Sequence, residues 1–144
     1  MKNIIRMFLF IYLIGHPEAG VRITDPMVAL VNEERSKENV SMLSQNYSLN
    51  SSAKMKACDL EKRDYWSHVD PDGNSSWYLF LESGYNYLYA GENLARDCED
   101  SRCIELLMES PEHKKNILDT RFKEVGIGRC GIYMVQHFGA KSNE

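Results

Sequence analysis

The sequence predicts an α+β domain in which several helices pack on a small antiparallel sheet. Apolar residues recur with the spacing of amphipathic helices through much of the chain up to about residue 118. The period then changes, because the last third alternates as two β-strands joined by a tight turn do. Helices first and strands late, ending in a hairpin, indicate α+β rather than a parallel α/β fold.

The 144 residues suit one domain, over residues 20–144, behind a distinct leader over residues 1–19. Lys2 and Arg6 flank the start, and an unbroken apolar run follows from Met7 to Ile14. A basic start before an apolar run of this length predicts an export signal peptide or an uncleaved anchor, and the run is too short for a standard membrane span. A buried N-terminal strand or helix is the alternative interpretation.

The charge pattern argues against polyanion binding. The formal net charge is −4 at pH 7, and lysines and arginines are scattered among acidic residues. Nucleic-acid-binding domains instead gather basic residues on one face. We expect a monomeric domain with no nucleic-acid partner and no membrane span beyond the leader.

Two helices are predicted in the first half of the domain. The first starts at Asp25-Pro26, because aspartate is a good N-cap and proline suits the first helical position. Its apolar stripe comprises Met27, Leu30 and Val31. After an irregular connection over residues 39–49, the second helix runs from about Asn50 to Asp64 with alternating apolar and charged faces.

A turn, a short helix and an extended segment follow. Asp70-Pro71-Asp72-Gly73 predicts a turn, because proline and glycine at this spacing favour the required dihedral angles. Residues 76–82 form a short aromatic helix, and residues 85–95 an extended segment rich in tyrosine.

The remaining elements are two helices and the hairpin. One helix is capped by Asp100 or Ser101, and a shorter one starts at Ser110-Pro111 and runs through Ile117. Strands over residues 125–128 and 132–138 are joined by a turn at Cys130-Gly131.

The four cysteines agree with export, because an even number in an oxidising compartment suggests disulfides. Four cysteines allow three pairings. Cys98 and Cys103 are close enough to close a small loop, which leaves Cys58 with Cys130. A metal site built from the cysteines is weakly supported, because no C-x-x-C pair occurs.

Three residues are the candidates for cleft chemistry: His68, Glu92 and His113. His113 falls at the third position of a helix, where the partial positive charge of the helix N-terminus favours a neutral ring that binds metal or accepts a proton. His68 lies between a helix and a turn, and Glu92 lies in an apolar, aromatic stretch. A buried carboxylate there needs partners, which two histidines would supply. Ordinary local hydrogen bonding is the alternative for each residue alone.

Other chemistries find less support. His137 alternates with Val135 and Tyr133 on a predicted strand, so we interpret it as a sheet-face residue rather than a ligand. The cysteines are assigned to disulfides, and the sequence contains neither a G-x-S-x-G elbow nor an H-E-x-x-H helix.

The order of several short motifs resembles the CAP superfamily, which groups cysteine-rich secretory proteins, antigen five and pathogenesis-related proteins. The closest likeness is to its short bacterial branch of SCP-like extracellular proteins, over about residues 26–139. The motifs are Ala29-Leu30-Val31-Asn32-Glu33-Glu34-Arg35, Trp66-Ser67-His68, Asp70-Pro71-Asp72-Gly73, Gly84-Tyr85, Ala90-Gly91-Glu92-Asn93-Leu94-Ala95, residues 110–118, residues 124–128 and Val135-Gln136-His137-Phe138-Gly139.

This resemblance implies an α-β-α sandwich with a central cleft. The family's cleft commonly holds two histidines and two acidic residues and can take up a divalent cation such as zinc. His68, Glu92 and His113 match three of those positions. The fourth departs, because Ser110 stands where the second acid would be and Leu107 replaces a helical tryptophan.

Three functions follow from this set. The favoured one is a secreted, periplasmic or cell-surface binding module whose cleft recognises a lipid, glycan, peptide or partner protein, with an optional divalent metal. The second is a zinc-dependent hydrolase, since two histidines and a glutamate with an open position form a catalytic type of zinc set. It would have to recruit Asp72 or Glu109 as general base. The third is a disulfide-stabilised structural protein without turnover.

Overall fold

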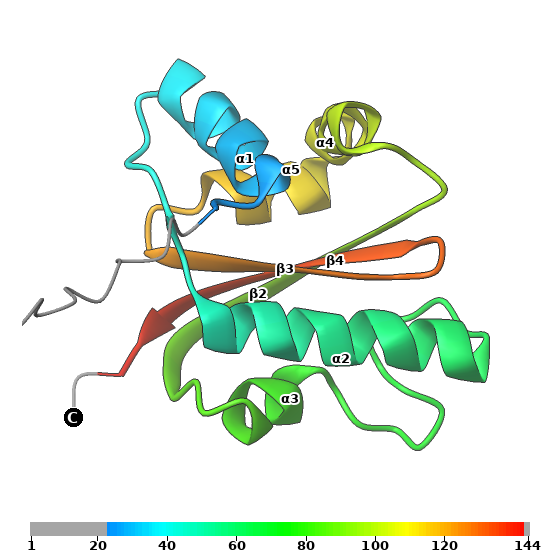
Figure 1. Ribbon diagram of the computed structural model, residues 1–144. Helices are drawn as coiled ribbons and strands as arrows, with labels where there is room; N and C mark the ends of the chain where they lie inside the picture. The colour runs from blue at the N-terminus through cyan, green and yellow to red at the C-terminus, as the bar shows by residue number, and fades with distance from the viewer. Residues whose placement is uncertain (1–22, 143–144) are drawn as a thin grey trace, which may run out of the picture.

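The domain is a three-layer α-β-α sandwich (Figure 1), in a computed structural model that describes residues 23–142. One helical layer contains α1, α4 and α5, and the opposite layer contains α2 and α3. The elements are α1 (Pro26–Lys37), β1 (Ser44–Gln45), α2 (Tyr47–Arg63), α3 (Trp77–Glu82), β2 (Tyr87–Arg96), α4 (Asp100–Glu109), α5 (Pro111–Leu118), β3 (Glu124–Cys130) and β4 (Tyr133–Lys141). The predicted α+β class and sandwich are confirmed.

The described sheet has four strands in the order β1-β3-β4-β2. Strands β3 and β4 form the predicted hairpin, and β2 pairs with the other side of β4, also antiparallel. Strand β1 adds a short parallel pair beside β3, which the sequence did not predict. Strand β2 is therefore an edge strand, and the central strand β4 is buried along nearly its whole length.

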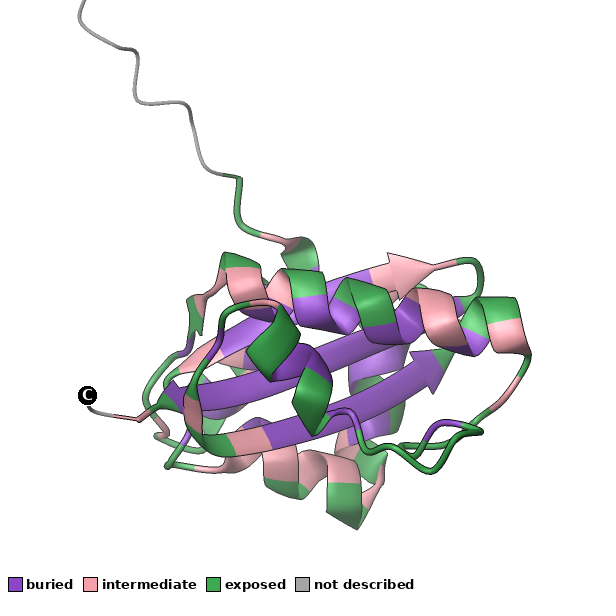
Figure 2. Cartoon of the chain, turned by 90° about the horizontal axis from the view of Figure 1, so that it is seen from below, coloured by how far each residue is buried: buried purple, intermediate pink, exposed green. Residues whose placement is uncertain are grey.

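Both faces of the sheet are covered. Figure 2 shows largely buried strands between helices whose outer faces are exposed. A large apolar cluster fills the side of α1, α4 and α5, around Val31, Leu107 and Phe138. Smaller clusters fill the side of α2 and α3, around Leu60 and Phe80.

The boundaries differ from the predictions mainly at α2. This helix begins at Tyr47 rather than near Asn50, because the Asn46 side chain accepts a hydrogen bond from the Leu49 amide and caps it. The start of α1 is as predicted, since Asp25 caps the helix through the Met27 amide.

Two glycines allow α2 to lie directly against the backbone of β3. A Cβ atom at Gly126 would lie 2.1 Å from the Leu49 carbonyl carbon, and one at Gly128 would lie 2.1 Å from the Lys54 amide nitrogen. No side chain fits at those distances, so at these two positions the helix contacts the strand backbone without an intervening side chain from β3.

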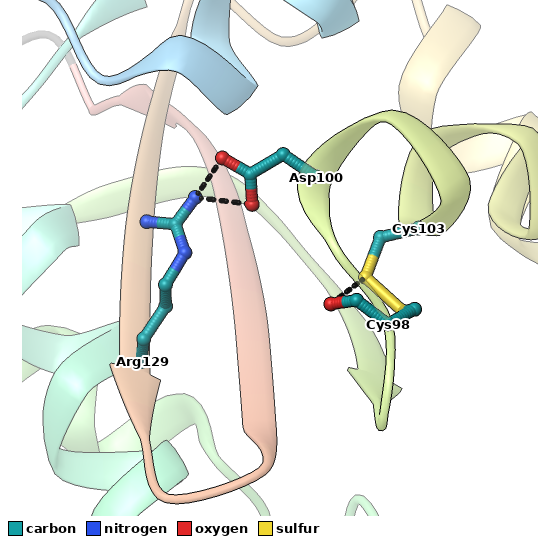
Figure 3. Close-up of a disulfide and its surroundings, with 4 residues drawn as sticks. All are labelled: Cys98, Asp100, Cys103 and Arg129. Carbon is teal, nitrogen blue, oxygen red and sulfur yellow. Dashed lines mark hydrogen bonds and ion pairs between the residues drawn. A yellow bond between two sulfur atoms is a disulfide. The ribbon is translucent and has the colours of Figure 1, made fainter.

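Both predicted disulfides are present. Cys58 on α2 is joined to Cys130 at the end of β3, and Cys98 is joined to Cys103 across the start of α4. Close to the second bridge, Arg129 of β3 forms an ion pair with Asp100 at 2.8 Å (Figure 3). Arg129 also pairs with the α1 cap Asp25 at 2.7 Å. These links tie the end of β3 to both helical layers.

The predicted leader, residues 1–19, lies outside the described residues. Within residues 23–142, no helix is long and apolar enough to cross a membrane.

The close approach of α2 to β3 predicts that Gly126→Ala is strongly destabilising. The added methyl group meets backbone atoms that cannot move independently, so we expect a loss of more than about 3 kcal/mol in the free energy of unfolding. The control is Gly84→Ala, where a Cβ atom meets nothing within 4 Å and only the positive φ of 76° opposes the change. Urea unfolding measures both, and equal losses would contradict the packing argument.

The two disulfides are expected to contribute unequally to stability. They join residues 72 and 5 positions apart. In the chain-entropy account, the longer loop stabilises the fold by about 4 kcal/mol and the shorter by about 2 kcal/mol. Replacing each pair with two alanines and measuring urea unfolding checks this order. A larger loss of stability on removing the Cys98–Cys103 pair would show that chain entropy does not determine the relative contributions of the two disulfides.

Candidate functional site

The centre of the site is Glu92, whose carboxylate is buried between two histidines. His68 Nδ1 lies 2.6 Å from Oε1, and His137 Nε2 lies 2.8 Å from Oε2. The register of β2 and β4 pairs Glu92 directly with His137, so the sheet itself brings these two side chains together. The sequence correctly predicts that Glu92 needs two histidine partners, but the second is His137 rather than His113.

These hydrogen bonds keep Glu92 ionised. Burial by itself raises the pKa of a carboxyl group, but the bonds to His137 and His68 outweigh burial and lower the pKa of Glu92 to about 2. The side chain is therefore an acceptor-only carboxylate at neutral pH.

His137 lies on β4, fully buried against the α2 and α3 layer. Its Nδ1 atom lies 2.7 Å from the Ser52 hydroxyl of α2, and its ring stacks on Phe80 with centroids 4.4 Å apart. Burial lowers the pKa of His137, although Glu92 opposes this, so the ring is held neutral. The prediction that His137 is a sheet-face residue is correct about its position on the strand. The hydrogen bond from His137 to Glu92 was not predicted, because it depends on the register of β2 and β4.

His68 occupies the segment between α2 and the predicted turn, whose Asp70 accepts hydrogen bonds from the Asp72 and Asn74 amides. The buried Lys56 ammonium donates to the His68 carbonyl over 3.2 Å and fixes the backbone of this segment. The His68 side chain remains 60% exposed. It therefore joins the buried carboxylate to solvent.

His113 is the third residue of α5, as predicted. Ser110 takes the cap position without a side-chain hydrogen bond. Burial and then the charge of His68 lower the pKa of His113, which favours the neutral ring. The sequence also predicts a neutral His113 ring, but from the partial positive charge of the helix N-terminus and not from burial.

Three amide side chains fasten α5 to the sheet beneath this residue. Asn116 donates to the Glu92 carbonyl and to the Asn93 side chain, over 3.0 and 2.9 Å. Asn93 in turn donates to the His113 carbonyl and to Gln136. None of the three amides is a predicted site residue, and only the position of Asn93 next to Glu92 along the strand could have indicated one.

Two adjacent cavities open beside Glu92, of about 290 and 270 Å³. They share His68, Ala90, Glu92 and Asn116 as a common wall, and together they are called the cleft below. The first is completed by Ser76, Trp77 and Gly91. The second is completed by Glu112, His113, Lys115, Asp119, Arg121 and Phe122. All three predicted site residues thus line one cleft.

The hydrogen bonds of Glu92 compete with its use as a metal ligand. Both carboxylate oxygens are occupied by imidazole nitrogens, and the His68 nitrogen nearest to Glu92 is occupied as well. Among residues 23–142, no group of three or more histidine, cysteine or acidic side chains is placed to hold a metal ion. The predicted divalent cation therefore stays a prediction.

The acids considered as a general base lie outside the cleft. Asp72 is paired with Arg63 at 2.9 Å, and Glu109 lies 3.9 Å from Arg102. Neither lines either cavity.

Comparison with known sequences identifies a family for most of the chain. Residues 28–137 match the profile of the cysteine-rich secretory protein family, CAP. The protein YkwD of Bacillus subtilis is 32% identical over 118 residues, which are 80% of this chain and 46% of that protein. The chain thus spans less than half the length of this relative.

Solved structures with the same fold include two bacterial proteins. An extracellular protein containing an SCP domain from Bacillus anthracis superimposes with a TM-score of 0.76 at 25% identity, over 80% of this chain and 39% of that one. An outer surface protein of Borrelia burgdorferi gives a TM-score of 0.75 at 22% identity, over 81% and 90% of the two chains. The second likeness concerns the fold alone.

The lowered pKa of Glu92 predicts a specific acid sensitivity. Because the folded-state pKa lies below the ordinary value of 4.5, ionised Glu92 stabilises the fold above about pH 4.5, and this contribution is lost as the pH falls towards 2. The free energy of unfolding of wild type should exceed that of Glu92→Gln by roughly 2 to 3 kcal/mol near pH 6, and the gap should narrow on acidification. Urea unfolding of both proteins across this pH range tests the prediction. A difference in the free energy of unfolding that does not change with pH would contradict it.

Proposed function

Because this chain belongs to the cysteine-rich secretory protein (CAP) family, we propose that it is an extracellular binding module whose cleft holds an oligosaccharide. The observation that carries the proposal is the pair of adjacent cavities that share Glu92 and His68 as a common wall. Two connected cavities of this size accept successive units of a chain-like ligand better than one compact molecule.

An extracellular location is supported by the two disulfides, which persist in oxidising compartments. The Bacillus anthracis neighbour is described as an extracellular protein and the Borrelia burgdorferi neighbour as an outer surface protein. A signal peptide at residues 1–19 would complete the route of export.

The first cavity has the composition of a sugar subsite. Trp77 supplies an aromatic wall, 38% exposed, against which the apolar face of a sugar ring packs. Ser76, Asn116 and His68 supply donors and acceptors for hydroxyl groups. An aromatic wall beside a few polar groups fixes orientation as well as affinity.

The second cavity adds charges of both signs. Glu112, Lys115 and His113 line it, and Arg121 is held there by Asp119 at 2.6 Å. This mixture suits a polar unit with amide or charged substituents. A lipid chain fits less well, because the lining of both cavities is interrupted by polar side chains. Peptide binding is the alternative outcome of the test below.

The divalent metal remains an optional part of this proposal. A cation bound to the native state must raise its unfolding temperature. Thermal unfolding with and without micromolar zinc therefore tests whether the cleft binds a metal. The proteins compared are wild type and the double variant His68→Ala with His113→Ala. Stabilisation confined to wild type would support the metal. A zinc-dependent hydrolase finds no further support, because Asp72 and Glu109 are engaged elsewhere.

Ligand binding is expected to depend on Trp77 and not on Trp66. We expect Trp77→Ala to weaken binding of an oligosaccharide about tenfold or more, because the aromatic wall is lost. Trp66→Ala is the matched control, because Trp66 is 43% exposed and stacks on Tyr133 but lines neither cavity. Amide chemical shifts recorded during titration with neutral and N-acetylated oligosaccharides, short peptides and detergent-solubilised lipids measure this.

Three results would count against the proposal: equal losses in the two tryptophan variants, shifts confined to residues outside the cleft, or no response to any oligosaccharide. A response to peptides alone would keep the cleft and replace the ligand class.

A further inference from the structure

We propose that the buried His137 is a positioning residue for the cleft. It holds the Glu92 carboxylate so that His68 donates from Nδ1 and presents Nε2 to the ligand as a hydrogen-bond acceptor. Ser52 completes the chain by donating its hydroxyl proton to His137. This inference deepens the proposed function, on which its statement about the ligand rests, but the proton positions belong to the ligand-free protein.

The hydrogen-bond directions follow from Glu92. An ionised carboxylate only accepts, so each imidazole nitrogen that faces it must carry a proton. Those nitrogens are Nδ1 of His68 at 2.6 Å and Nε2 of His137 at 2.8 Å. The carboxylate therefore fixes which nitrogen of each ring carries a proton, and in the neutral form of each ring this selects one tautomer.

His137 then has one free nitrogen, which must accept. The ring has no solvent exposure, and burial disfavours a second proton on it. Its Nδ1 atom lies 2.7 Å from the Ser52 hydroxyl, whereas the Leu49 carbonyl lies 3.0 Å from the same hydroxyl. The single hydroxyl proton therefore goes to His137, over the shorter contact.

Ser52 does not act as a nucleophile in this arrangement, although a serine, a histidine and a carboxylate lie in sequence. The residue is fully buried on α2, beneath the sheet, and lines neither cavity. No ligand in the cleft reaches it. Its role is to satisfy the buried His137 nitrogen, which would otherwise lose a hydrogen bond.

The exposed end of the chain is His68. Because Nδ1 is committed to Glu92, its second nitrogen is the one available to the cleft, and the side chain lines both cavities. A carboxylate behind an imidazole fixes the ring orientation and strengthens the opposite nitrogen as an acceptor. The matching ligand group is a donor, which a sugar hydroxyl or an amide N–H provides.

The test measures the NMR chemical shifts of the imidazole nitrogens in the ligand-free protein near pH 8. These shifts distinguish protonated from unprotonated nitrogens. We expect His68 to be protonated at Nδ1 and His137 at Nε2. In His137→Leu the donor to Glu92 is lost, and we expect His68 to lose its fixed Nδ1–H form. His137→Gln restores a donor amide and should restore that form.

Leu107→Ala is the control for lost stability, because Leu107 is buried in the cluster on the opposite side of the sheet. This variant should lower the urea midpoint of unfolding and leave both tautomers unchanged. If His137→Leu does not fold, His137→Asn, whose amide is too short to reach Glu92, is assessed in the same way.

Several results would overturn the inference. These are a wild-type His68 protonated at Nε2 alone, a wild-type His137 protonated at Nδ1 or at both nitrogens, and a folded His137→Leu in which His68 keeps its Nδ1–H form. Failure to bind any oligosaccharide would refute the proposed function and leave the tautomers as assigned. The two failures are therefore distinguishable.

Discussion

The fold and the site both depend on the direct contact of α2 with the backbone of β3. Gly126 and Gly128 remove the side chains that would separate helix from strand. Gly126 pairs with His137 across the hairpin, so the same contact brings α2 within hydrogen-bond distance of that histidine. A larger residue in β3 would move the helix outward and separate Ser52 from the ring. The glycines therefore determine what lies behind the cleft as well as how the layers pack.

The pairing of β4 with β2 links this contact of α2 with β3 to the cleft. His137 lies on the central strand β4, and the antiparallel register places Glu92 beside it on the edge strand β2. Because β2 is an edge, the far side of Glu92 meets a loop instead of another strand, and the loop supplies His68. One row of polar groups thus runs from the buried Ser52 on α2 to solvent at His68. A buried charge is tolerated here because both oxygens are hydrogen-bonded and the pKa of Glu92 is lowered.

The features that depend on neighbouring residues could be predicted from sequence most directly. Asp25 caps α1 through its own turn, and the Asp70 turn is built from adjacent side chains and amides, so both follow from local chemistry. The place of His68, Glu92 and His113 in one cleft was predicted through family resemblance. The bond between Glu92 and His137 could not be predicted, because it requires the register of two strands that lie 45 residues apart. The short strand β1 was missed because two residues have no periodicity.

The two cleft histidines are consequently unequal. His68 is held by a carboxylate through a bond of 2.6 Å, whereas His113 on α5 has no such partner among the hydrogen bonds of residues 23–142. Burial and the nearby His68 lower the pKa of His113, so the neutral ring is favoured there. A fixed acceptor and a ring free to choose its tautomer recognise different groups: the first requires a donor, and the second accommodates a donor or an acceptor. Under the proposed function, this asymmetry would favour one direction of a chain-like ligand, because reversal would exchange the groups that meet the two rings.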